Sequence, residues 1–97
     1  MAGSRTISGA PSYGFNNIAT QTTTVVKTGS GHLHSITINT TAAAAITIYD
    51  NTAGSGTTIA TIAASPAIGS TFLFDVAFNT GLTIVTAGAS NITVAYM

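Results

Sequence analysis

The residues best suited to chemistry in this sequence are two histidines, His32 and His34, separated by a single leucine. In an extended strand both imidazoles would project from the same face, because residues i and i+2 share a face. Imidazole nitrogens bind zinc, iron and copper, but one copy of the chain supplies two of the about four ligands in a closed structural site. Three copies around a three-fold axis would supply more. Two histidines at the start of a strand, one packed and one solvated, need no metal. We therefore expect no metal and no cofactor. His32 and His34 are the candidate ligands for the case in which the protein does bind a metal.

Asp50 and Asp75 are the only carboxylate side chains in the sequence. Glycoside hydrolysis needs two carboxylates that flank the substrate, and calcium needs several oxygen ligands. Asp50 precedes Asn51 at the start of a turn, where a side-chain oxygen could cap the backbone toward Gly54. Asp75 lies on the polar side of its strand, where it could meet Lys27 or a backbone N–H. We predict structural roles for both carboxylates.

Motifs for nucleophilic catalysis and phosphate binding are missing from the sequence. No serine stands in a G-x-S-x-G pattern. The Gly-Ser-Gly sequences at 29–31 and 54–56 lack the lysine and the following helix of a phosphate-binding loop. We therefore expect that the protein is not an enzyme.

Charge is scarce in this 97-residue chain. Charged residues make up 4% of it, against about 25% in an average globular domain. Two basic residues cannot form the electrostatic footprint of a nucleic-acid-binding protein. No apolar run approaches the ~18 residues of a membrane span, and the first residues lack the continuous apolar stretch of a secretory signal. A small, neutral, threonine-rich chain is typical of a protein that packs against copies of itself or against partners.

Alternating apolar and polar residues predict about seven strands and no helix. The strands are expected at residues 22–27, 32–39, 45–50, 57–63 and 91–96, with two more in a long hairpin at 70–86. In that hairpin Phe72, Phe74, Val76 and Phe78 share one face, which we predict to be the core. Ile59 and Ile62 are three residues apart, which indicates a bulge.

This pattern predicts an all-β fold: a single antiparallel β-sandwich at residues 21–97, for which jelly-roll and immunoglobulin-like wirings both fit. Residues 1–20 follow no strand or helix period. We expect them to form an extended N-terminal arm, because disordered tails seldom keep large apolar residues. Tyr13, Phe15 and Ile18 are its candidate partner-binding residues.

The region from Val25 to Tyr96 resembles a group of small tailed-bacteriophage virion proteins. The segments that carry this resemblance are GHLHSITIN, ITIYDNTAGSGTTIATI, FLFDVAFNTGLTIVTAG and NITVAY. The resemblance is to capsid decoration (cement) proteins and head-fibre bases, and it implies a β-sandwich or jelly-roll core and a homotrimer bound to the capsid.

The function expected from these observations is capsid decoration without catalysis. The partners would be further copies in a homotrimer and the major capsid protein or another virion protein, with no nucleic acid and no membrane. The protein would be made in the host cytoplasm and end on the capsid surface of the virion. The alternative is a receptor- or carbohydrate-binding module of a tail fibre or head fibre, in which Tyr13, Tyr49 or Tyr96 could stack on sugars.

Overall fold

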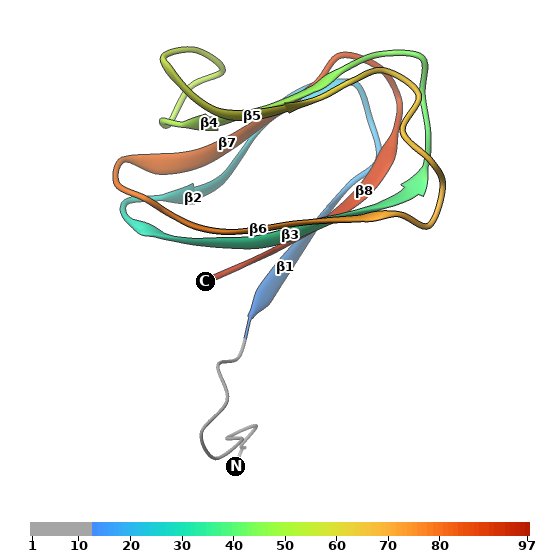
Figure 1. The fold of residues 1–97 in the computed structure, drawn as a ribbon. Helices are drawn as coiled ribbons and strands as arrows, with labels where there is room; N and C mark the ends of the chain where they lie inside the picture. The colour runs from blue at the N-terminus through green and yellow to red at the C-terminus, as the bar shows by residue number, and fades with distance from the viewer. Residues whose placement is uncertain (1–12) are drawn as a thin grey trace, which may run out of the picture.

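The computed structural model describes residues 13–97, which form eight β-strands in two layers (Figure 1). The strands are β1 (Gly14–Ile18), β2 (Thr22–Thr28), β3 (Gly31–Thr40), β4 (Ile46–Asp50), β5 (Thr57–Ile62), β6 (Thr71–Phe78), β7 (Gly81–Thr86) and β8 (Asn91–Tyr96). They make two four-stranded antiparallel sheets with the orders β1-β8-β3-β6 and β2-β7-β4-β5. The all-β prediction is confirmed. The described residues include no helix that is long and apolar enough to cross a membrane.

The strands pair in a nested order. β1 pairs with β8, β2 with β7, β3 with β6 and β4 with β5. The chain is thus one long hairpin whose tip is the turn between β4 and β5. Two further pairings, β3 with β8 and β4 with β7, join these pairs into sheets. The consecutive strands β4 and β5 lie in the same sheet. The other pairs of consecutive strands lie in different sheets, so the connections between them cross from layer to layer.

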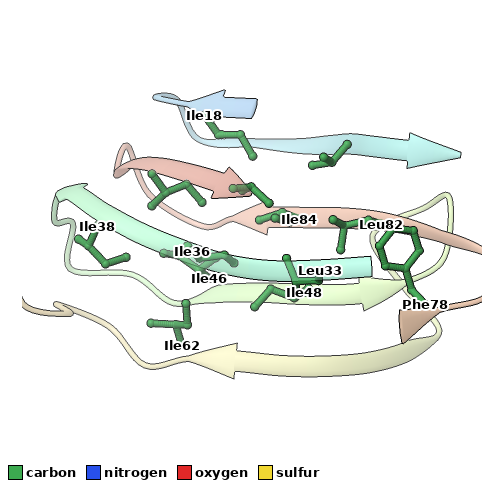
Figure 2. Close-up of a cluster of buried hydrophobic side chains, with 13 residues drawn as sticks. Ile18, Leu33, Ile36, Ile38, Ile46, Ile48, Ile62, Phe78, Leu82 and Ile84 are labelled. Atoms are coloured by element: carbon green, nitrogen blue, oxygen red, sulfur yellow. The ribbon is translucent and has the colours of Figure 1, made fainter. Parts of the chain in front are cut away.

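The core lies between the two sheets and consists of aliphatic side chains and one phenylalanine (Figure 2). Both layers contribute, because alternate residues of each strand point inward. The fully buried apolar side chains are Leu33, Ile36, Ile38, Ile46, Ile48, Phe78, Leu82, Ile84, Ile92 and Val94. β-Branched isoleucine and valine suit such a core, since they pack well on a pleated surface.

The stretch 70–86 differs from the predicted hairpin. Its two strands lie in different sheets, and β6 is an outermost strand. Phe78 is buried, and Phe72 and Phe74 are partly buried against the core, whereas Val76 is 36% exposed. β7 is the more deeply buried of the two strands. The alternation gave the inward direction of the phenylalanines correctly, but it could not show that the turn after β6 crosses to the other layer.

The eighth strand comes from the region that we expected to be an arm. Residues 14–18 pair with β8, and Ile18 is buried in the core of its own domain. Residues 1–12 of the expected arm lie outside the described residues. The bulge predicted near Ile59 is present, because Ile48 pairs with Ala60 and the next residue, Tyr49, pairs with Thr58.

Burial predicts unequal effects of two apolar substitutions, one in β6 and one in the connection that precedes it. Phe78→Ala removes a fully buried ring and should lower the free energy of unfolding by about 3–5 kcal/mol. Ile68→Ala is the control, since Ile68 is 66% exposed, and it should change that free energy by no more than about 0.5 kcal/mol. Urea denaturation of the isolated protein measures both. Equal losses would contradict the assignment of Phe78 to the core.

Candidate functional site

Three side chains capable of binding a metal gather on the surface of the β1-β8-β3-β6 sheet. They are His32 and His34 of β3 and Asp75 of β6, and one ligand atom from each lies within 4.8 Å of the others. His34 Nδ1 is 2.6 Å and His32 Nε2 is 3.3 Å from the same carboxylate oxygen, Asp75 Oδ1. Each residue is partly exposed to solvent. Two imidazoles therefore converge on one oxygen at an open surface.

Two irregularities of the sheet produce this convergence. On β3 the step from Leu33 to Ser35 is two positions long, whereas the paired step on β8 is only one position long. On β6 the step from Leu73 to Val76 is three positions long, opposite the same two-position step of β3. Both strands thus carry an extra residue at this level. A bulge bends the strand and redirects the side chain at that position.

Asp75 is the residue with an unusual backbone at the bulge of β6. Its φ is +49°, in the left-handed region that aspartate tolerates better than most residues. With this backbone its carboxylate accepts hydrogen bonds from both histidine rings. In a regular strand the Asp75 side chain would simply follow the alternation of its neighbours between the two faces of the sheet.

Tyr13 covers the cluster. Its ring stacks on the ring of His34 with centroids 4.3 Å apart and planes 15° apart, and it is tilted against the ring of His32 at 6.2 Å. Tyr13 directly precedes β1. The start of the described chain thus restricts the orientation of imidazoles that lie on β3.

The two histidines stabilise the ionised form of Asp75. The hydrogen bond from His34 and then that from His32 lower the pKa of the Asp75 carboxyl below its ordinary value. The site therefore keeps a carboxylate beside two nitrogen donors. The two imidazoles and the carboxylate could together act as ligands of a metal ion.

The second carboxylate, Asp50, has a structural role at the far end of β6. It accepts backbone N–H bonds from Asn79, Thr80 and Gly81 at distances of 2.8–3.3 Å. These bonds, with that from Asn79 the largest cause, lower the pKa of Asp50. Asp50 thereby holds the connection by which the chain crosses from β6 to β7. The turn after β4 is instead capped by Asn51, which accepts from the Thr52 N–H and donates to the Ser55 carbonyl.

The structure brings His32 and His34 onto one face, as their spacing predicts, and adds Asp75. We had expected Asp75 near Lys27 or a backbone N–H. Asp75 is more than forty residues from either histidine in the sequence, so no local pattern could show the contact. Of the candidate partner-binding residues, Tyr13 contacts the histidines, Phe15 is 73% exposed and Ile18 is buried.

Acid should reveal the contribution of Asp50 to folding. A carboxyl whose pKa is lower in the folded chain stabilises the fold above its unfolded pKa, and this stabilisation is lost as the pH falls through the folded pKa. We expect the urea midpoint of the wild type to fall as the pH drops below about 4. Asp50→Asn should have a lower midpoint at neutral pH and a weaker dependence on acid.

The double variant Asp50→Asn, Asp75→Asn is the control, since it lacks all carboxylate side chains. Its midpoint should be nearly constant over the acid range in which the wild type weakens. An unchanged acid response in the double variant would contradict the assignment.

Comparison with known proteins identifies no relative of this chain. No family model, no curated protein and no solved structure matches the chain. We therefore infer the function from the residues and contacts of the chain itself.

Proposed function

We propose that this chain is a non-enzymatic capsid decoration (cement) protein of a bacteriophage, which acts as a homotrimer on the capsid surface. The observation that carries the proposal is a row of four paired residues across the β1-β8-β3-β6 sheet. Phe15 pairs with Ala95, Ala95 with Ser35, and Ser35 with Leu73. Phe15 and Leu73 end the row on the outermost strands and are 73% and 66% exposed.

The two ends of this row suit contact between copies. Directly paired residues of neighbouring strands lie on the same face of a sheet, so Phe15 and Leu73 mark opposite edges of one face. Natural edge strands are commonly protected by lysine or proline. β1 (GFNNI) and β6 (TFLFDVAF) contain neither. Within the part of the chain that the structure describes, each of these strands lacks a neighbour on one side, and this edge with its exposed apolar side chains supports pairing with another chain.

The strand directions are compatible with a head-to-tail ring. The sheet is antiparallel and has four strands, so β1 and β6 run in opposite directions. The β6 edge of one copy would meet the β1 edge of the next as an antiparallel neighbour. Such head-to-tail contacts close into cyclic oligomers when the rotation permits, and three copies would give the trimer.

The part of the outer face around Asn91, away from the histidine cluster, adds a neutral surface for packing. Asn17 and Asn39 both donate to Asn91 Oδ1, and Asn39 also donates to Thr93. These amides form a polar row without charge. Burying such a face removes little charge from water, which limits the desolvation cost of association.

The wiring supports a jelly-roll interpretation of the sandwich. An immunoglobulin-like fold places its first two strands in one sheet, whereas β1 and β2 lie in different sheets. Eight strands with nested pairing fit the double-sheet jelly roll, an architecture found among viral capsid and lectin domains. This agrees with the resemblance of the sequence to phage virion proteins.

Catalysis finds little support in the described residues. Asp50 is engaged by backbone N–H groups and Asp75 by two histidines. A shallow depression at the ends of β2 and β7 is lined by residues without an ionisable side chain, namely Gln21, Thr22, Thr23, Val85, Thr86 and Ala87. The carbohydrate-binding alternative is not favoured either, because Tyr49 and Tyr96 belong to opposite sheets.

The proposed ring predicts how edge variants assemble. The wild type should be a trimer by light scattering after gel filtration, and Phe15→Lys and Leu73→Lys should each prevent ring closure. Val25→Lys is the matched control, because Val25 is 45% exposed on an outermost strand of the other sheet. An equimolar mixture of the two edge variants should yield a dimer, since it contains one intact pair of edges. A monomeric wild type, or an oligomer that persists in both edge variants, would overturn the proposed ring.

Capsid binding tests the decoration role. A deletion that tests the expected arm must end at residue 12, because Gly14–Ile18 forms β1. We expect the wild type to sediment with undecorated capsids of the phage that encodes it, and the deletion variant to bind more weakly while remaining trimeric. A trimer without affinity for these capsids would refute the decoration role and leave only self-association.

A further inference from the structure

We propose that His32 Nε2, His34 Nδ1 and the Asp75 carboxylate of a single chain bind one divalent transition-metal ion, for which Zn²⁺ fits best. This site goes beyond the proposed capsid role and does not depend on it. It also differs from a site shared by three copies, since one chain supplies all three ligands.

The distances within the cluster fit a small cation. Zinc binds histidine nitrogen and carboxylate oxygen at about 2.0–2.2 Å, so tetrahedral ligand atoms lie roughly 3.3 Å apart. The three ligand atoms here lie within 4.8 Å of one another, and Asp75 Oδ1 is 2.6 Å and 3.3 Å from the two nitrogens. Small side-chain rotations place all three around one ion.

The ligand types select the class of metal. Calcium and magnesium prefer oxygen ligands, and this cluster offers two imidazoles and one carboxylate. Two nitrogens with one carboxylate are the protein ligands of open zinc sites, in which a water takes the fourth position. The described residues offer no cysteine and no further histidine, so we expect an open coordination position at the ion.

The ligands are held on strands and not on loops. His32 and His34 belong to β3, whose bulge faces the bulge of β6 that carries Asp75. The stacked ring of Tyr13 restricts His34 further. A ligand set that is already oriented loses less conformational entropy when the ion binds.

The hydrogen bonds of the cluster point to the same centre. Without metal, each imidazole donates one N–H to Asp75 Oδ1. When an ion binds between the three groups, each neutral ring coordinates it through the nitrogen that faces Asp75 and carries its single proton on the other nitrogen. The His32 and His34 rings would therefore bind metal through different atoms, Nε2 and Nδ1, because His34 lies opposite the bulge and closer to Asp75.

Bound metal would link the outermost strand β6 to its neighbour β3. Any ligand that binds only the folded chain shifts the folding equilibrium toward that chain. We therefore expect ZnCl₂ to raise the thermal midpoint of the protein, and MgCl₂ at the same concentration to have no comparable effect.

Titration calorimetry with ZnCl₂ on the untagged protein tests the site directly. The wild type should bind one ion per chain. His34→Gln and Asp75→Asn should each weaken binding by more than about 100-fold, since loss of an outer hydrogen-bond partner alone costs 10–100-fold. Asp50→Asn is the control, because it makes the same charge change at the other carboxylate, and its affinity should match that of the wild type. Circular dichroism confirms that each variant is folded.

Nitrogen-15 spectra of the histidine rings give a second test that needs no variant. Added Zn²⁺ should shift Nε2 of His32 and Nδ1 of His34 to metal-bound positions and leave the other two nitrogens protonated. Binding of less than one ion per chain, equal affinity in wild type and His34→Gln, or shifts at the wrong nitrogens would each overturn the proposal.

Discussion

The nested pairing of the first four strands with the last four is the constraint on which the rest of the structure depends. Gly14 pairs with Tyr96, and Thr22 pairs with Thr86. These contacts join distant parts of the chain, so the entropy of closing long loops must be offset by burial of the shared core. The row from Phe15 to Leu73 and the cluster of His32, His34 and Asp75 therefore exist only in the completed fold.

The paired bulges of β3 and β6 bring His32, His34 and Asp75 together on the surface of the sheet. A regular ladder would place one β6 residue opposite His34. The extra residue and the positive φ of Asp75 instead place a carboxylate between two imidazoles. The same bulge interrupts the free edge of β6 beyond Phe74. The first half of this edge, up to Phe74, thus remains regular for pairing with another chain. The second half begins with Asp75 of the cluster.

Alternation in the sequence was sufficient to predict seven of the eight strands, the lack of helix among the described residues and the inward phenylalanines, because burial on one face has a period of two. It could not assign strands to sheets. A turn such as Asn79–Thr80 looks the same whether it closes a hairpin or crosses between layers. The first strand was missed because Gly14–Ile18 contains two asparagines and little alternation. The shared face of His32 and His34 followed from their spacing, whereas Asp75 joined them only through the pairing of β3 with β6.

Both carboxylate side chains of the chain act on β6, which has a strand partner on one side only among residues 13–97. Asp75 links the middle of β6 to β3, and Asp50 binds the backbone directly after its end. An outermost strand has fewer contacts than a central one and is free to fray unless such bonds hold it. A rigid edge is also the better surface for association, because less motion is lost when a second chain pairs with it. In a chain with so few charges, the placement of both carboxylates around one strand thus serves the fold and the proposed assembly through the same contacts.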